Sequence, residues 1–272
     1  MREVTEKRTT DMEDVRAVEL YAEFRRSYQT KRVTISVSSP DLAGDLTMPA
    51  FPMMMFHQAV SDPLREMSRS TNDFQRWINM LAAWEPIYEA CNQDEKLSIL
   101  GEHIAPISAL VLGAPQALRG RMIFAAATGC GHANYHLSGT RPDLQWNGSG
   151  HLTMSVASRI GQPWAKWRQL APILGELGRG SISEDTDDYR NQREHGHPRN
   201  IGMGLTASVS VTEDAGGRSW GFGSKEAIPL ETVINVAVGQ HAVVVRAYEA
   251  LCDLAHEQFE ALMVFDRTNT AT

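Results

Sequence analysis

The sequence predicts a mostly α-helical protein, a helical bundle with a small peripheral β-hairpin and an N-terminal α/β appendage. Apolar residues recur at helical spacing through most of residues 71–272, which is typical of core-facing helices. Alternation of polar and β-branched residues is confined to short segments. The 272 residues, 42% of them hydrophobic, are enough to bury a sizeable core. We therefore expect residues 1–70 to form the appendage and residues 71–272 to form the bundle.

The appendage begins with an expected amphipathic helix over residues 11–26, where apolar side chains recur among Glu, Asp and Arg. Residues 32–38, Arg-Val-Thr-Ile-Ser-Val-Ser, alternate polar and β-branched side chains and predict a half-buried strand. A loop containing several prolines follows over residues 40–52. A short helix is expected over residues 53–68, restricted by Pro63.

The first helix of the bundle is predicted to start after Thr71, a suitable N-cap, because apolar residues from Phe74 to Tyr88 fall on one face. Gly113-Ala114-Pro115 is expected to end one helix and start another, since proline suits a first helical turn. Further helices are expected over residues 96–112, 115–137 and 154–174, with a loop over 140–150 and a kink at Pro163.

A short helix is predicted to begin at Ser181-Ile182-Ser183-Glu184, which has the S-x-x-E form of a capping box. It reaches about His195, where Gly196 is a suitable C-terminal cap. The nearby acidic side chains are expected to favour the dipole of its first turn.

The remaining elements are a hairpin and a long helix. Period-two runs over residues 206–212 and 218–223 flank Asp214-Ala215-Gly216-Gly217, which predicts two strands joined by a turn. Residues 230–265 are rich in Val, Ala and Leu and lack proline, so we expect the longest helix there.

Composition limits the classes of function. The 26 Lys+Arg against 33 Asp+Glu give a formal charge of -7, which argues against a chain-wide basic surface for nucleic acid. Three widely separated cysteines form neither a disulfide framework nor a CxxC metal knuckle. The N-terminus lacks the apolar region of a secretory signal, and polar residues interrupt the apolar stretch 104–124. We therefore expect a cytoplasmic protein that does not span a membrane.

The most informative motif is Arg190-Asn191-Gln192-Arg193-Glu194-His195. On a helix Asn191 and His195 share a face and Arg190 lies one residue round, so all three project toward one surface. Arginine has a fork geometry that suits phosphate oxygens, and an ordinary histidine, with a pKa of about 6.5, suits proton abstraction near neutral pH. The alternative is structural: Arg190 and His195 cap a helix end and form surface ion pairs. Glu194 is expected either to raise the pKa of the neighbouring His195 or to pair with Arg193.

This Arg190-Asn191-x-x-x-His195 arrangement resembles the R-[polar]-x-x-x-H signature of the HEPN superfamily, helical-bundle proteins that include many metal-independent ribonucleases. The resemblance covers roughly residues 70–265 as architecture. It implies that Arg190, Asn191 and His195 from two copies of the chain meet in one composite catalytic site, so the protein would be a homodimer.

The resemblance further implies an endoribonuclease that cleaves RNA through 2′-hydroxyl attack, uses no cofactor or metal, and acts as a toxin or antiviral defence effector. A cognate inhibitor or another defence-system protein would then be a partner. Four basic residues would supply local positive charge for RNA: Lys166, Arg168, Arg193 and Arg199. The alternative from a different class is a non-catalytic HEPN-like dimer that binds a nucleotide or a protein.

A second cluster predicts a different chemistry. Cys130, His132 and His136 are potential metal ligands, with the two histidines one helical turn apart. A fourth ligand would have to come from elsewhere, such as His151 or His195. The competing interpretation is that the histidines hydrogen-bond in or beside the core while Gly129 and Gly131 permit close helix packing.

Overall fold

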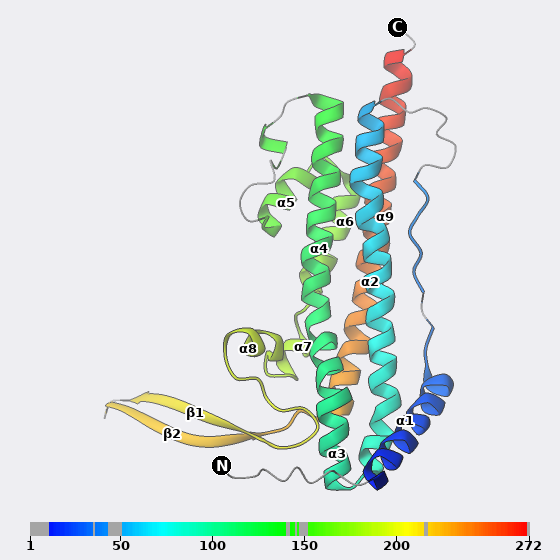
Figure 1. The fold of residues 1–272 in the computed structure, drawn as a ribbon. Helices are drawn as coiled ribbons and strands as arrows, with labels where there is room; N and C mark the ends of the chain where they lie inside the picture. The colour runs from blue at the N-terminus through cyan, green and yellow to red at the C-terminus, as the bar shows by residue number, and fades with distance from the viewer. Residues whose placement is uncertain are drawn as a thin grey trace, which may run out of the picture.

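The computed structural model describes residues 11–34, 36–42, 51–139, 142–144, 146, 152–214 and 217–270, and it confirms the mostly α-helical fold with a small hairpin. Three long helices run side by side along the molecule: α2 (Phe51–Ala90), α4 (Ala105–Ser138) and α9 (Leu230–Thr270) (Figure 1). Shorter helices pack against this trio. The hairpin extends away from one end of it.

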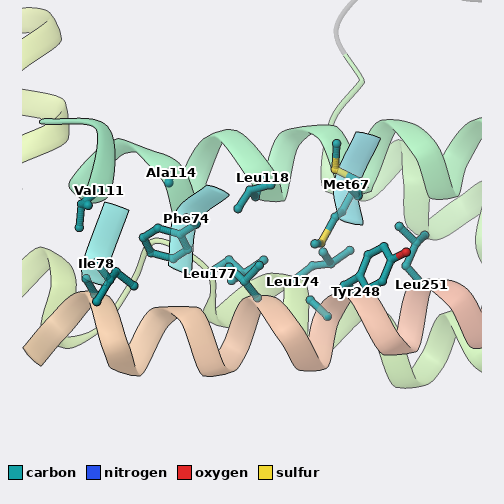
Figure 2. Packing of buried hydrophobic residues seen from close by; sticks show 14 of the residues in the cluster. Met67, Phe74, Ile78, Val111, Ala114, Leu118, Leu174, Leu177, Tyr248 and Leu251 are labelled. Atoms are coloured by element: carbon teal, nitrogen blue, oxygen red, sulfur yellow. The ribbon is translucent and has the colours of Figure 1, made fainter. Parts of the chain in front are cut away.

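The core is a continuous apolar seam between the three long helices. Leu81 of α2, Val111 of α4 and Val233 of α9 are completely buried. Figure 2 shows how side chains from α2, α4, α6 and α9 interdigitate along the seam. The labelled residues are Met67, Phe74, Ile78, Val111, Ala114, Leu118, Leu174, Leu177, Tyr248 and Leu251.

Helix α2 runs straight through the boundary that we expected near residue 70. Residues 51–70 therefore belong to the bundle, and the expected helix over 53–68 is the first half of α2. Thr71 is not an N-cap, because it lies inside the helix with no exposed surface. The polar residues Ser68 and Asn72 on either side of it contact a neighbouring segment of the chain.

That segment was expected to be a strand over residues 32–38, and its described residues form no strand. It is extended and lies along α2 after helix α1 (Asp11–Lys31). The amide of Asn79 accepts a hydrogen bond from the Val33 N–H at 3.2 Å and donates one to the Val33 carbonyl at 2.7 Å. Asn72 holds Val37 in the same way, at 3.0 and 2.9 Å. Two asparagine side chains thus replace the partner strand that we expected.

The helices expected over residues 96–112 and 115–137 form one continuous rod without a break at Gly113-Ala114-Pro115. Helix α3 (Gln93–Ile99) passes through a π-helical turn, η1 (Leu100–Ile104), directly into α4. The π-helical turn ends just before Pro106, and α4 begins there. Pro106 therefore lies in the first turn of α4, where the N–H group that proline lacks would have no partner within the helix. Pro115 is buried within α4, where packing offsets the lost hydrogen bond.

The helix expected over residues 154–174 is broken at Pro163. After the short 3₁₀ turn η2 (Pro142–Leu144) come α5 (Met154–Gly161) and α6 (Ala165–Glu176). The carboxylate of Glu257 on α9 accepts hydrogen bonds from the Ala165 and Lys166 N–H groups at 2.9 and 2.8 Å. This cap from another helix satisfies the new N-terminus that the break creates.

The last short elements are α7 (Ser181–Glu184) and α8 (Tyr189–His195), followed by strands β1 (Leu205–Asp214) and β2 (Gly217–Glu226). The strands pair antiparallel, so the predicted hairpin is confirmed and is longer than expected. The predicted long C-terminal helix is also confirmed, as α9.

One helical stretch of the described chain, Gln93–Ser138, is long and apolar enough by composition to cross a membrane. In its most apolar window 44% is buried inside the protein, and α4 packs against both α2 and α9. A core helix of a soluble bundle has the same character.

The corner between α5 and α6 generates a prediction about packing. A methyl group at Gly161 would overlap the indole ring of Trp167, which is buried. We expect Gly161→Ala to lower the free energy of unfolding by about 1–3 kcal/mol, measured by urea denaturation. The matched control is Gly175→Ala in α6, where nothing lies within 4 Å; it should leave stability unchanged or raise it by up to about 1 kcal/mol. Equal effects would contradict this packing.

His241 generates a prediction about pH. It is 2% exposed beside Phe74, and burial lowers its pKa, although a hydrogen bond to the Thr71 backbone partly opposes this. The unfolded chain therefore binds a proton below about pH 6.5 that the folded chain does not, so stability falls as pH falls. We expect His241→Leu to lose less unfolding free energy than wild type between pH 7.5 and 5.5. The exposed control His256→Leu should follow wild type, and equal slopes for both variants would refute the assignment.

Candidate functional site

Helix α8 brings the predicted residues Arg190, Asn191 and His195 to one surface of the protein. Asn191 and His195 are exposed, with 70% of the His195 side chain accessible, and the Arg190 side chain is 34% accessible. Positions 190, 191 and 195 span about 140° of this helix, with Asn191 and His195 about 40° apart and Arg190 at the other edge, so a ligand that contacts all three has to extend across this side of the helix.

Tyr189 anchors this short helix to the bundle. It is 8% exposed and lies with Leu112 of α4 and Ile182 of α7 around a small cleft that also touches Arg190. Burial raises the pKa of Tyr189, and the nearby Arg193 lowers it by less. The orientation of the exposed face is thus set by one buried aromatic side chain.

The entry into α8 differs from the predicted capping box. Gly180 precedes α7 as its N-cap, so Ser181 is the first helical residue and α7 ends after one turn. Asp187 and Asp188 then adopt left-handed backbone angles, and the Asp188 N–H donates to the Ser183 carbonyl at 2.7 Å. The acidic residues here form a turn between two helices, whereas the sequence had suggested one helix.

The same turn connects α8 to the hairpin. Asp187 forms an ion pair with Lys225 of β2, and Arg199 donates two hydrogen bonds to the Glu226 carbonyl, at 3.0 and 2.8 Å. Motif helix and hairpin base are therefore held in a fixed relation by contacts between residues about 30 positions apart. The sequence gives no local signal for these contacts.

Arg190 is already paired in this structure. Its guanidinium lies 2.8 Å from the Glu194 carboxylate, one helical turn away, so the expected Glu194–Arg193 pair is not the one that forms. Glu194 also lies 3.9 Å from the His195 imidazole. A carboxylate therefore sits between the cation and the base, and an incoming phosphate has to compete with it for Arg190.

The basic residues expected to attract RNA do not gather around α8. Arg193 lies on the helix itself, but Arg199 is engaged at the hairpin base, and Lys166 pairs with Asp253 of α9 at 3.0 Å. Lys166 and Arg168 belong to α6, which lies farther along the bundle than α8 (Figure 1). Local positive charge near the motif comes from Arg190 and Arg193.

The alternative metal site at Cys130, His132 and His136 is contradicted. Cys130 is fully buried and accepts a hydrogen bond from Gln258 at 3.0 Å, whereas His132 is exposed. Two residues apart on a helix, these side chains point about 160° away from each other. His136 pairs with Asp266 at 2.7 Å. Within the described residues no three His, Cys, Asp or Glu side chains could hold a metal ion; His151 lies outside them.

Comparison with known proteins adds no relative. No protein-family model matches the chain, and neither a curated protein nor a solved structure matches it significantly.

The anchoring of α8 by Tyr189 is testable by hydrogen exchange. We expect Tyr189→Ala to speed amide exchange in residues 189–195 at least about tenfold, equivalent to about 1.4 kcal/mol of local opening free energy, with the long helices unchanged. Arg193→Ala, an exposed change on the same helix, is the control and should leave exchange as in wild type. Unchanged exchange in Tyr189→Ala would mean that α8 is held by other contacts.

Proposed function

We propose that this protein is a metal-independent, HEPN-type endoribonuclease that works as a homodimer, with Arg190, Asn191 and His195 as its catalytic residues. The observation that carries the proposal is the display of these three side chains together on one face of a helix that is anchored by Tyr189. His195 is 70% accessible, as a base that acts on an external substrate has to be. The resemblance of the motif supplies the reaction class.

The chemistry assigned to each residue follows from its side chain. Neutral His195 removes the proton from a ribose 2′-hydroxyl, and the resulting oxygen attacks the adjacent phosphorus. Arg190 stabilises the charge that develops on the phosphate oxygens, and Asn191 orients the phosphate. The bond from phosphorus to the 5′-oxygen breaks, and His195 of the second copy, which starts the step protonated, donates its proton to that oxygen. The products are a 2′,3′-cyclic phosphate and a 5′-hydroxyl.

Glu194 has a place in this scheme. Its ion pair with Arg190 neutralises the guanidinium until a phosphate replaces the carboxylate. Because both partners are partly exposed, we expect the pair to contribute little to stability and to exchange readily. Substrate binding would thus release Glu194 beside the histidine.

The same ion pair is the observation that favours the second candidate function, a non-catalytic HEPN-like dimer that binds a nucleotide or a protein. In that case Arg190 and Glu194 form a permanent surface pair, and α8 serves as a docking face.

The test is cleavage of a labelled RNA by the purified full-length protein. We expect cleavage to persist in excess EDTA and to leave 2′,3′-cyclic phosphate ends. His195→Ala and Arg190→Ala should each reduce the single-turnover rate by about 10²–10⁴, as loss of a general acid–base group does. Circular dichroism establishes that each variant is folded.

Two variants serve as controls. His197→Ala removes an exposed histidine two residues away and should retain activity. Glu194→Gln keeps Arg190 but removes its partner, and should cleave at least as fast as wild type. Absence of cleavage with RNAs of varied sequence, or equal loss in His197→Ala and His195→Ala, would overturn the ribonuclease proposal.

A further inference from the structure

The hairpin, here called the arm (β1 and β2), has an uncovered apolar face. The strand register places Val209 opposite Phe222, and Leu205 and Trp220 lie at even spacings from these, so all four share one face. They are among the most exposed large apolar residues described: Leu205 66%, Val209 57%, Trp220 60% and Phe222 87%. Every residue of β2 is exposed. A two-stranded arm of this kind is marginally stable alone in water.

The arm is nevertheless fixed in direction at its base. Beyond the Asp187–Lys225 and Arg199–Glu226 contacts, Ile201 and Ile228 form a parallel bridge whose backbone hydrogen bonds are 2.7–2.8 Å long. Both isoleucines are buried. The arm therefore projects from the bundle on a firm base (Figure 1), and it cannot fold back onto its own helices without breaking these contacts.

Helix α4 carries a second uncovered apolar surface, here called the strip. Its positions recur at helical spacing on one face, which Thr128 and the exposed Arg121 border: Leu110, Gly113, Ala117, Gly120, Phe124, Gly131 and Tyr135. Leu110, Phe124 and Tyr135 are 49%, 48% and 57% exposed. Phe124 is partly screened by an edge contact with Trp146.

The glycines of the strip have no role within one copy of the chain. A Cβ atom at Gly113, Gly120 or Gly131 would meet nothing within 4 Å. Each glycine costs the helix about 1 kcal/mol relative to alanine. Gly129 on the opposite side of α4 shows the contrast, because there Gln258 and Val60 approach to 3.0 and 3.2 Å. Glycines on an open face allow another backbone or aromatic ring to approach closely.

From these two surfaces we infer that the arm of one copy of this protein packs its Leu205/Val209/Trp220/Phe222 face on the α4 strip of a second copy, and that a twofold exchange of arms builds the homodimer. The inference deepens the proposed function, because it names the surface of the dimer on which the composite ribonuclease site rests.

The strip is long enough to receive the arm. The apolar residues of the arm, from Leu205 to Trp220 at the level of Val211, span about 20 Å, so the arm covers about half of the strip, which spans about 38 Å from Leu110 to Tyr135. With two large aromatic side chains, each arm covers about 500 Å² on each side of its contact. Two contacts related by twofold symmetry therefore bury about 2,000 Å², within the range of stable interfaces.

A second copy is the occupant that the chain itself supplies. Each copy displays one apolar arm and one apolar strip, so an isologous pair covers all four surfaces without another component. A membrane is the competing occupant. A hairpin with one apolar face and one polar face, the latter carrying Thr206 and Ser208, is compatible with either occupant, so vesicle binding is measured beside the oligomeric state.

The first test is the oligomeric state, measured by light scattering and by sedimentation from 0.1 to 50 µM. Wild type should be a dimer. Trp220→Ser/Phe222→Ser and, separately, Gly120→Arg should weaken dimerisation at least 100-fold while circular dichroism stays unchanged. The matched controls are Ser208→Asp on the polar face of the arm and Gly175→Arg, another helical glycine with open space around it; both should remain dimers. A monomeric wild type, or dimers in both interface variants, overturns the inference.

The second test identifies which surfaces meet. In a Cys91→Ser, Cys252→Ser background, Phe222→Cys protein mixed with Gly120→Cys protein should form a covalent heterodimer with a short bismaleimide linker, and each variant alone should not. Cross-linking between two copies of the Phe222→Cys protein would show that the arms contact each other, and it would overturn docking on the strip.

The remaining outcomes separate this inference from the proposed function. RNA cleavage is assayed on the same variants. If the dimer requires the arm but cleaves no RNA, the inference is retained and the ribonuclease proposal is refuted. If the dimer forms without the arm and cleaves RNA, the ribonuclease proposal is retained and the inference is refuted. A monomer that binds phosphatidylcholine/phosphatidylglycerol vesicles through Phe222 would assign the apolar surfaces to a membrane and overturn the inference.

Discussion

The fold depends on one constraint, the burial of a continuous apolar seam between α2, α4 and α9. Packing along this seam stabilises each long helix, so the helices continue through residues that normally end a helix. Pro63 and Pro86 lie inside α2, and Pro115 lies inside α4. Each removes a backbone hydrogen bond, and packing over many turns outweighs that loss. The short helices, the motif and the arm are all positioned by their attachment to this rod.

Periodicity was sufficient to predict the fold class, the hairpin and α9, because amphipathic patterns report directly on which side chains are buried. Polar residues and prolines were less reliable as indicators of where helices begin and end. Thr71 was expected to be an N-cap but lies inside α2, and the neighbouring Asn72 satisfies backbone groups of a distant segment. Pro163 does end a helix, and there a carboxylate from α9 caps the next one. Neither partner can be identified from local sequence.

In the candidate site, too, features within one helix were predictable from the sequence, and contacts between distant segments were not. Helical spacing predicted that Arg190, Asn191 and His195 share a surface, because this depends only on positions within one helix. The Arg190–Glu194 ion pair also lies within that helix, and the four-residue spacing favours it over a pair between the adjacent Arg193 and Glu194. The Asp187–Lys225 contact depends on tertiary structure and had no local signal. Cys130 and His132 failed as joint ligands because their angular separation on α4 puts one in the core and the other in solvent.

The two asparagines that hold the extended segment contact only main-chain atoms of Val33 and Val37. Any residue except proline at these two positions presents the same N–H and C=O groups. Position 33, where the side chain is 54% exposed, is therefore free to vary in amino-acid identity, whereas Val37 also packs against the apolar core. Among homologues we expect Asn72 and Asn79 to be retained more strictly than the residue at position 33.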